Sequence, residues 1–279
     1  MTIALAAGLI WLGSFFAGFL GALTGLGGGV VLVPLLTLGF GVDIRYAVGA
    51  SLVSVIATSS GAAAAYVREG FSNVRIGMLL EVATTLGALL GAYLAGLLSA
   101  SAVAGVFGVV LLWSAWTAWS QPEHHEAAPA VPDRLSRLLR LHGTYPGPEG
   151  EVAYSATRVP LGFGLMGLAG ALSGLLGIGS GAVKVLAMDR AMRLPFKVST
   201  TTSNFMIGVT AAASAGIYLR RGYIDPGLVM PVMLGVLPGA MLGSRLLAGT
   251  RVRLLRVVFA IVIAALGMEM LYTALRGTL

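Results

Sequence analysis

The sequence predicts an all-α polytopic membrane protein of two inverted repeats, each a glycine-broken helix hairpin plus three transmembrane helices, with about 8–10 membrane segments in total. Three observations lead to this prediction: the composition, the long apolar runs and an internal repeat. Of the 279 residues, 57% are hydrophobic and 10% are charged, and the mean hydropathy is +0.91. Soluble domains contain about 25% charged residues. The composition therefore indicates an integral membrane protein.

The apolar runs can cross about 30 Å of hydrocarbon as helices, and they lack the alternation of a membrane β-strand. The net charge of +7 requires no nucleic-acid partner, because basic residues collect in the cytoplasmic loops of membrane proteins. The chain has no cysteine, which excludes disulfides and thiolate metal sites. Residues 4–23 lack a basic start and a small-residue cleavage site, so we expect a retained helix rather than a signal peptide.

The sequence repeats itself after 152 residues. The motif "YVREG" at 66–70 corresponds to "YLRRG" at 218–222. Near the start of each half, "GALTGL" at 21–26 resembles "GALSGL" at 170–175. Because several such matches occur in the same order, they indicate two copies of one structural unit.

Each half is predicted to contain an apolar helix, a glycine break, a short apolar segment and three spans. The short segments, 30–40 and 182–192, would cover about half of the hydrocarbon core at 1.5 Å per residue. We expect them to be half-helices or re-entrant elements. The predicted spans are 46–67, 74–98 and 101–119 in the first half, and 198–219, 223–247 and 253–275 in the second.

Residues 120–157 separate repeat 1 (1–119) from repeat 2 (158–279) and hold charges of both signs and all three histidines. We expect an extramembrane loop. Within it, 133–142 places leucines on one face and arginines on the other, which favours a short interfacial helix, with a solvated loop helix as the alternative. Most arginines near span ends gather on the side of this loop, so the loop is predicted to be cytoplasmic and both termini external.

Two glycine-rich breaks, 27–29 and 177–181, are predicted to form the functional centre. Non-helical backbone at membrane depth persists only where it is buried in protein or lines a wet cavity. A helix that restarts after a break points unpaired N–H groups and the positive end of its dipole at that break, which favours an anion. Close helix packing is the alternative, and we expect it instead for 87–91 and 239–243. The glycine-break residues predicted to bind substrate are Gly27, Gly28, Gly29, Gly179, Ser180 and Gly181.

The stretch "KVSTTTSN" at 197–204 carries six hydroxyl or amide side chains at the start of a span. Such groups bind oxyanions through neutral donors. Helix capping and hydrogen bonds between helices are the alternative. The residues that we include in the substrate site are Ser199, Thr202 and Ser203, which share a side of the helix, the deeper Asn204, and Ser51, which falls opposite Ser203 in the repeat.

Ionisable residues inside spans are expensive and usually mark a pathway or a partner. Lys184 follows the second break, where a cation opposes the helix dipole unless an anion joins them. We therefore predict that Lys184 binds substrate, with snorkelling or an ion pair with Glu81 or Glu269 as alternatives. Glu81 has no acidic counterpart in the second half and is the candidate for proton coupling; an interface carboxylate or a salt bridge would also explain it.

These glycine and hydroxyl motifs resemble a known family. "GLGGGVVLVPLL" at 25–36, "GIGSGAVKV" at 177–185 and "LPFKVSTTTSNFMIGVTAAASAGIYLRRG" at 194–222 are similar to the TauE/SafE family of sulfite exporters, over nearly the whole chain outside 120–157. The resemblance implies a bacterial or archaeal inner-membrane transporter. It also implies a sulfur-containing anion as substrate, such as sulfite, thiosulfate or sulfoacetate, moved typically outward and coupled to the proton gradient.

Other classes of function fit the sequence less well. An enzyme is not predicted, because the serine of "GIGSG" has no base nearby and the histidines lie in the central loop. No cofactor or metal is predicted, since the adjacent ligands of "EHHE" at 123–126 suit a solvated turn better than a metal site. An anion channel, an importer or a non-transporting membrane sensor are the alternatives. Besides the small anion and the bilayer, a second copy of the chain is a candidate partner, since the glycine faces could serve either internal packing or a homodimer.

Overall fold

The computed structural model describes residues 3–24, 28–68, 72–120, 133–147, 150–247 and 252–277. The first half contains α1 (Ile3–Thr24), α2 (Gly29–Pro34), the π-helical turn η1 (Leu35–Gly39), α3 (Ile44–Arg68), α4 (Val74–Ala95) and α5 (Ala100–Ser120). The central segment contains α6 (Arg134–Leu138), β1 (His142–Gly147) and β2 (Gly150–Ser155). The second half contains α7 (Val159–Leu176), α8 (Gly181–Leu186), η2 (Ala187–Ala191), α9 (Phe196–Arg220), α10 (Pro226–Leu247) and α11 (Val252–Arg276).

The long helices have the dimensions of membrane spans. In the described ranges, α1, α4, α5, α7 and α10 are long and apolar enough to cross a bilayer. Helices α3, α9 and α11 have 25 residues each, or about 37 Å at 1.5 Å per residue. All six spans predicted in the two halves are helices whose ends differ from the prediction by at most three residues. The prediction of a polytopic α-helical membrane protein is confirmed.

After the first helix of each half, equivalent elements of the two halves begin 152 residues apart. The shift holds for the short helices, for the π-helical turns that continue them and for the three long helices that follow. A π-helical turn carries an extra residue and is rare, so its recurrence at the same place in both halves is a strong sign of duplication. The paired first residues are Gly29 and Gly181, Leu35 and Ala187, Ile44 and Phe196, Val74 and Pro226, and Ala100 and Val252.

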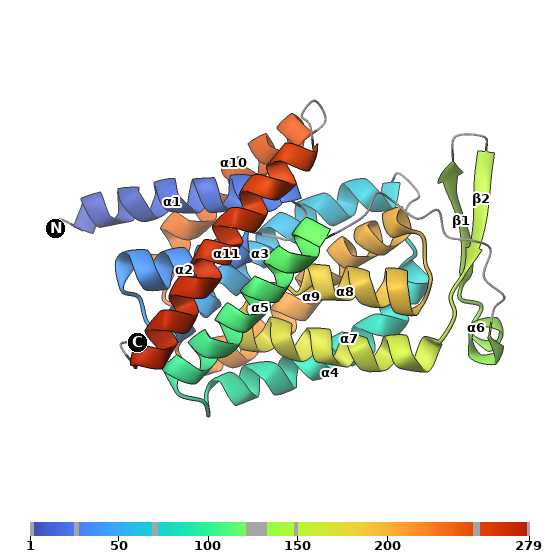
Figure 1. The fold of residues 1–279 in the computed structure, drawn as a ribbon, viewed down its shortest axis with the longest axis horizontal. Coiled ribbons are helices and arrows are strands. Elements are labelled where there is room, and N and C mark those ends of the chain that lie inside the picture. Colours follow the sequence, from blue (N-terminus) through green and yellow to red (C-terminus); the bar gives the residue numbers. More distant parts are fainter. Residues whose placement is uncertain are drawn as a thin grey trace.

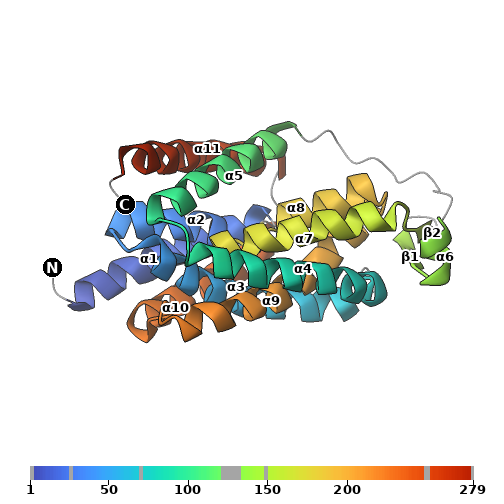
Figure 2. The ribbon, with the colours of Figure 1, turned by 90° about the horizontal axis from the view of Figure 1, so that it is seen from below.

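The helices form an elongated bundle (Figure 1). Both termini lie at one end and the β1–β2 hairpin at the other, with α2 in the half that carries the termini and α8 in the half that carries the hairpin. Helix α1 packs on α10, α4 on α7, α3 on α9, and α5 on α11. The α5–α11 pair forms an outer layer over the rest of the bundle (Figure 2). If each helix is replaced by its equivalent in the other half, the α1–α10 pair becomes the α7–α4 pair. The α3–α9 and α5–α11 pairs stay the same.

Glycines set the close approach of two of these helix pairs. A Cβ added to Gly91 of α4 would overlap the carbonyl group of Ala171 on α7, and one added to Gly239 of α10 would overlap the carbonyl oxygen of Phe15 on α1. The predicted packing role of 87–91 and 239–243 is confirmed, and these glycine faces are used inside the chain. The glycines packed in this way are Gly18 of α1, Gly87 and Gly91 of α4, Gly170 and Gly174 of α7, and Gly235, Gly239 and Gly243 of α10.

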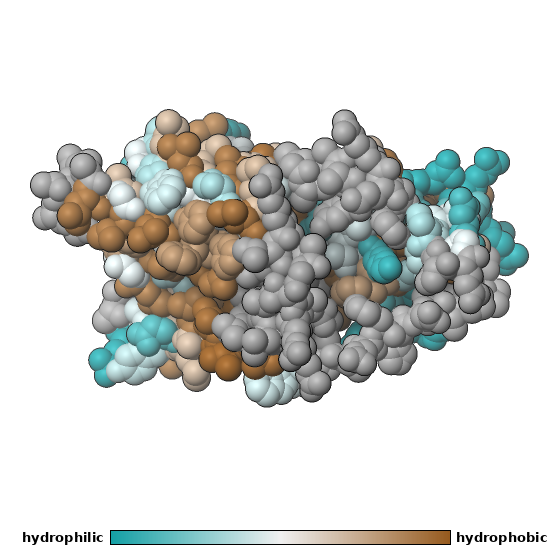
Figure 3. All heavy atoms as spheres, turned by 90° about the horizontal axis from the view of Figure 1, so that it is seen from above, coloured by the Kyte–Doolittle hydropathy of each residue, from teal (hydrophilic) through white to brown (hydrophobic). Residues whose placement is uncertain are grey.

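The outer surface of the bundle is apolar. Figure 3 shows hydrophobic side chains over much of one face, with hydrophilic residues gathered at the end that carries the hairpin. Large hydrophobic side chains on the long helices are more than half exposed, among them Leu86, Trp116, Leu168 and Leu234. A contiguous apolar surface of this extent is the part of a membrane protein that contacts lipid tails.

The central segment differs from the expected loop. Instead of a helix over 133–142, the chain forms the short helix α6, whose N-terminus is capped by Asp133 Oδ1 accepting from Ser136 N at 2.7 Å. An antiparallel hairpin, β1–β2, then follows, so the protein is not all-α outside the spans. Pro146 lies within β1, where proline is tolerated because the strand is at the edge of its sheet. The "EHHE" motif lies outside the described residues.

We expect Gly91→Ala to destabilise the protein by about 2 kcal/mol or more, because the added methyl group forces α4 away from the α7 backbone. The thermal midpoint of the purified protein in detergent measures this effect. Gly164→Ala on α7 is the matched control, since a Cβ there meets nothing within 4 Å. Equal midpoints for the two variants would contradict the packing role of Gly91.

Candidate functional site

The second glycine break has a defined backbone conformation. Helix α7 ends at Leu176, and Gly177, Gly179 and Ser180 have φ of +68°, +71° and +46° before α8 restarts at Gly181. The left-handed region costs a non-glycine residue such as Ser180 about 1 kcal/mol or more. The Ser180 hydroxyl is also buried without a hydrogen-bond partner in the described structure. An unpartnered polar group in a strained turn is the kind of feature that marks a binding site.

The first break lies between Thr24, where α1 ends, and Gly29, where α2 begins. Gly27 lies outside the described residues. Gly28 is the residue before α2, and its carbonyl oxygen accepts from the N–H groups of Val31 and Leu32 at 3.2 and 3.0 Å. These are the first hydrogen bonds of the restarted helix. The N–H groups that precede them at the start of α2 therefore have no carbonyl acceptor within the helix.

The two breaks contact each other. A Cβ on Gly29 would lie 2.8 Å from the carbonyl oxygen of Gly177 and 2.5 Å from Ser51 Oγ, so only glycine fits at this position. Ser51 on α3 donates from Oγ to the same Gly177 oxygen at 2.7 Å. The structure therefore brings together both breaks and one of the predicted hydroxyl residues.

The hydroxyl cluster at the start of α9 divides into two groups. Ser203 donates from Oγ to the carbonyl oxygen of Gly181 at 3.4 Å and so belongs to the second break. Thr202 instead accepts from the backbone N–H of Asn73 at 3.1 Å, and Ser199 donates to the carbonyl oxygen of Leu194 at 3.5 Å. Asn204 is half-buried. Ser199 and Thr202 thus make the structural contacts that the sequence left open as the alternative for this stretch.

Lys184 and Glu81 meet through a third residue. Lys184 is fully buried on α8 and donates from Nζ to Thr210 Oγ1 of α9 at 2.6 Å. Thr210 donates to Glu81 Oε1 of α4 at 2.8 Å, and Thr85 donates to the same oxygen at 3.0 Å. Glu81 Oε2 has no partner within the described structure. An ion pair of Lys184 with Glu81 was one of the alternatives predicted from the sequence. The sequence did not predict that Thr210 joins these two residues.

The trio of Lys184, Thr210 and Glu81 occurs once, not once per repeat. Shifted by 152 residues, Lys184 corresponds to Leu32 and Glu81 to Met233. Thr210 corresponds to Thr58, which donates to the carbonyl oxygen of Ser54 at 3.0 Å just as Thr210 bonds to Met206. The lysine and the glutamate have no charged counterparts in the other repeat, and this asymmetry was the signal that the sequence offered for the site.

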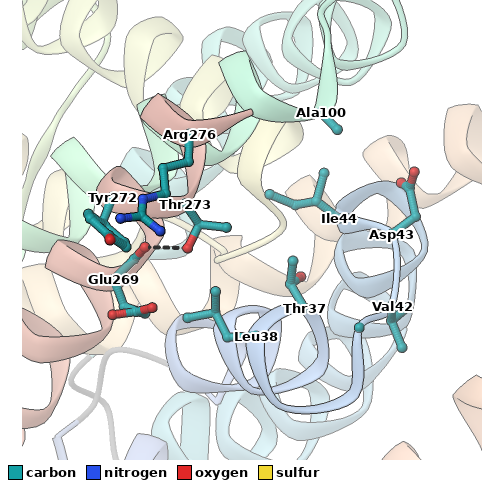
Figure 4. Close-up of a pocket in the computed structure, with 11 residues that line it drawn as sticks. Thr37, Leu38, Val42, Asp43, Ile44, Ala100, Glu269, Tyr272, Thr273 and Arg276 are labelled. Atoms are coloured by element: carbon teal, nitrogen blue, oxygen red, sulfur yellow. Dashed lines mark hydrogen bonds between the residues drawn. The ribbon is translucent and has the colours of Figure 1, made fainter. Parts of the chain in front are cut away.

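A separate cavity of about 550 Å³ lies at the end of the bundle that carries the termini (Figure 4). It is lined by η1, the start of α3 and the last turns of α11, and its lining includes none of the predicted site residues. Glu269 lies here, beside Arg276, whose guanidinium stacks over the Tyr272 ring at 4.3 Å. Glu269 therefore belongs to this cavity rather than to the Lys184 site.

The hairpin is tied to the opposite end of the bundle. Asn73 donates from Nδ2 to the Tyr154 hydroxyl at 2.8 Å, while its own Oδ1 caps α4 by accepting from Ile76 N at 3.0 Å. Burial raises the pKa of Tyr154 above its ordinary value of 10.0. Residues 133–147 and 150–155 therefore form an ordered cap on the bundle instead of a free loop. The described residues contain no group of three or more His, Asp or Glu able to hold a metal ion.

Long apolar helices, two broken helices in contact, and a buried lysine joined to a buried glutamate define a multi-pass α-helical membrane protein with a polar centre. The chain belongs to the sulfite exporter TauE/SafE family, whose model matches residues 10–270. This is a family of membrane transporters.

The curated relatives are full-length matches. The chain is 24% identical over 263 residues to the probable membrane transporter protein YunE of Bacillus subtilis, covering 92% of this chain and 94% of the relative. It is 27% identical over 238 residues to the probable membrane transporter protein YdhB of the same organism, covering 85% and 89%. A probable membrane transporter protein of Xylella fastidiosa is 26% identical over 261 residues, covering 91% of each chain. No solved structure matches the chain.

We expect Tyr154→Phe to loosen the hairpin by about 1 kcal/mol, because it leaves the Asn73 amide without its acceptor. Limited proteolysis at Arg140 and Arg158, which flank the hairpin, should become about fivefold faster. Since the folded pKa is raised, the neutral phenol stabilises docking below pH 10, and this contribution is lost as the pH rises through the folded value.

Tyr145→Phe is the matched control, since Tyr145 packs its ring at 6.1 Å from that of Tyr154. It should be cleaved at the wild-type rate and keep the alkaline release that Tyr154→Phe lacks. Identical cleavage of wild type and Tyr154→Phe at all pH values would mean that the Asn73 contact does not hold the hairpin.

Proposed function

We propose that the protein is a secondary transporter that exports a small sulfur-containing anion across the inner membrane, coupled to the proton gradient. Sulfite, thiosulfate and organosulfonates such as sulfoacetate are the substrates considered. The family description, a sulfite exporter, and the transporter names of the relatives support this proposal. The residues of the candidate site support an anion as the substrate.

The observation that carries the proposal is the position of Lys184. It is a fully buried cation in the first turn of a helix that restarts inside the membrane. There its charge opposes the positive end of the helix dipole, an arrangement that an anion relieves. The first hydrogen bond of α8 runs from Lys184 N to Ser180 O, so the N–H groups before it have no partner within the helix. Together with the unpartnered Ser180 hydroxyl, these groups suit an oxyanion.

Both breaks contribute to the proposed substrate site, near the middle of the membrane. From the first come Gly27, which no structural observation covers, Gly28 and Gly29, and from the second come Gly179, Ser180 and Gly181. Ser51 and Ser203 join them through their hydrogen bonds to the second break. In this proposal Ser199, Thr202 and Asn204 support the site from α9 without touching the anion.

The helix pairing supports an inverted repeat. The pairs α1–α10 and α7–α4 exchange when the halves are exchanged, as a two-fold axis in the membrane plane would require. The short helices α2 and α8 lie in opposite halves of the molecule (Figure 1). In such a carrier, the two repeats rock about a central site that opens to one side at a time.

The charge distribution supports a cytoplasmic hairpin. Among the basic residues whose side chains the structure describes, more lie at the hairpin end than at the end with the termini, as the positive-inside rule requires of the cytoplasmic side. Those at the hairpin end are Arg75, Arg134, Arg137, Arg140, Arg158, Arg190, Arg193 and Lys197, and those at the other end are Arg45, Arg220, Arg221 and Arg276.

Flux of sulfite, thiosulfate, sulfate and sulfoacetate into proteoliposomes tests the proposal. Wild type should carry at least one of the sulfur anions with saturable kinetics that respond to an imposed pH gradient. Conductance set only by voltage and concentration would instead show a channel. Binding without flux would show a sensor.

Lys184→Ala should weaken anion binding by about 10- to 100-fold, the value of one hydrogen bond to a charged group. Lys184→Gln, which keeps a donor for Thr210 but loses the charge, should bind almost as weakly. Isothermal titration calorimetry with purified protein measures both. Lys197→Ala is the control, because Lys197 is exposed at the end of α9. Unchanged affinity in a folded Lys184→Gln protein would remove Lys184 from the site.

A further inference from the structure

The hydrogen bonds around Thr210 couple two opposite charges through one proton. A hydroxyl donates one hydrogen, and Thr210 is placed to give it to Glu81 Oε1 at 2.8 Å while accepting from Lys184 Nζ at 2.6 Å. A competing acceptor, Met206 O, lies at 2.9 Å. All three side chains of the trio are at most 7% exposed. The charges of Lys184 and Glu81 are therefore poorly screened, and the protonation state of either residue influences which protonation state the other prefers.

No other charged side chain is placed to replace Lys184 as the partner of Glu81 among the described residues. Helix α7, which packs on α4, has no charged residue between Val159 and Leu176. On α9, Lys197 and Arg220 lie at the two ends, about 20 and 15 Å along the helix from Thr210. The remaining charges on neighbouring segments are Asp189 and Arg190 in η2 and Arg75 near the start of α4.

The lysine also faces the proposed anion site. Side chains on a helix tilt toward its N-terminus, so the Lys184 side chain extends along α8 toward the break, where the Ser180 hydroxyl has no partner. In the proposed site the ammonium group therefore serves both Glu81, which it reaches through Thr210, and the anion. It cannot fully neutralise both negative charges.

We propose that the anion and a proton bind together and cross the membrane in the same direction, with Lys184 shared between them, Glu81 carrying the proton and Thr210 positioning the pair. This inference rests on the function proposed above. Without substrate, Lys184 neutralises Glu81 through Thr210. When an anion binds to the ammonium group of Lys184, Glu81 becomes a buried carboxylate with a second negative charge nearby and a weaker interaction with Lys184. It then takes a proton from water on the open side, forming an O–H bond at Oε2, and the same bond breaks when the site opens to the other side.

The coupling is reciprocal. If anion binding favours protonation of Glu81, protonation of Glu81 must favour anion binding by the same factor. One proton cancels one negative charge, so a doubly charged anion such as thiosulfate crosses with one net negative charge, and its movement also responds to the membrane potential. Export then proceeds when the internal anion concentration and the membrane potential together outweigh the inward proton concentration gradient.

Proton uptake on binding tests this inference independently of transport. Purified protein in weakly buffered detergent, with a pH indicator, is mixed with thiosulfate. We expect wild type to take up about one proton per bound anion at a pH where Glu81 is ionised without substrate. Glu81→Gln mimics the protonated carboxyl group, so it should bind thiosulfate with an affinity that no longer depends on pH and should take up none. Proton release by wild type, or unchanged uptake by Glu81→Gln, would overturn the proposal.

The number of protons taken up and the pH dependence of affinity distinguish a coupling role of Thr210 from a purely structural one. Thr210→Val separates Lys184 from Glu81, so the number of protons taken up per anion should fall toward zero and the pH profile of affinity should flatten. Thr210→Ser restores the hydroxyl and should restore both. Thr58→Val is the matched control, because Thr58 makes the same bond to its own helix, to Ser54 O at 3.0 Å. A Thr210→Val protein that is only less stable, with a wild-type pH profile, would remove Thr210 from the coupling.

Proteoliposomes loaded with a pH dye separate this inference from the function on which it rests. Thiosulfate entry should acidify the interior in wild type and leave it unchanged in Glu81→Gln. Anion flux without acidification, or with alkalinisation, would overturn co-transport and leave the transporter proposal standing. Proton uptake on binding without any flux would support the coupling and overturn transport.

Discussion

The contact between the two glycine breaks is the constraint on which the rest of the structure depends. Gly29 lies against the Gly177 carbonyl with no room for a side chain, and Ser51 bonds to the same oxygen. Backbone without helical hydrogen bonds is costly in hydrocarbon, so each break must be buried by protein. Each half supplies the cover for the other half's break. Neither half of this chain could therefore place its broken helix in a membrane alone, and the two are folded as one bundle.

Close backbone packing then fixes how the helices surround the breaks. Glycines of α10 pack against the backbone of α1. Glycines of α4 pack against the backbone of α7, and glycines of α7 pack against the backbone of α4. In lipid, such packing replaces the hydrophobic effect as the force that joins helices. It leaves α3 and α9 to pack together at the centre, where they present Ser51, Ser203 and Thr210 to the breaks and to the buried charges.

Most of the fold could be predicted from the sequence, because membrane spans are set by length and hydropathy and a duplication checks one half against the other. The breaks and short helices were predicted for the same reason. The hairpin was missed, since its pairing depends on packing against the bundle rather than on a strong local pattern. Thr210 was missed because a threonine inside a membrane helix usually bonds to its own backbone. Only the three-dimensional neighbourhood of Glu81 and Lys184 distinguishes Thr210 from Thr58.

The charged trio breaks the symmetry that the duplication would otherwise impose. In the carrier proposed above, two identical inverted halves would make the outward-open and inward-open shapes equal in energy. With lysine and glutamate present at one set of equivalent positions and leucine and methionine at the other, the two shapes surround these charges differently. The carrier proposed above would therefore favour one of its two shapes even in a bilayer without voltage or concentration differences, so the position of two charged residues would give a duplicated scaffold a default orientation.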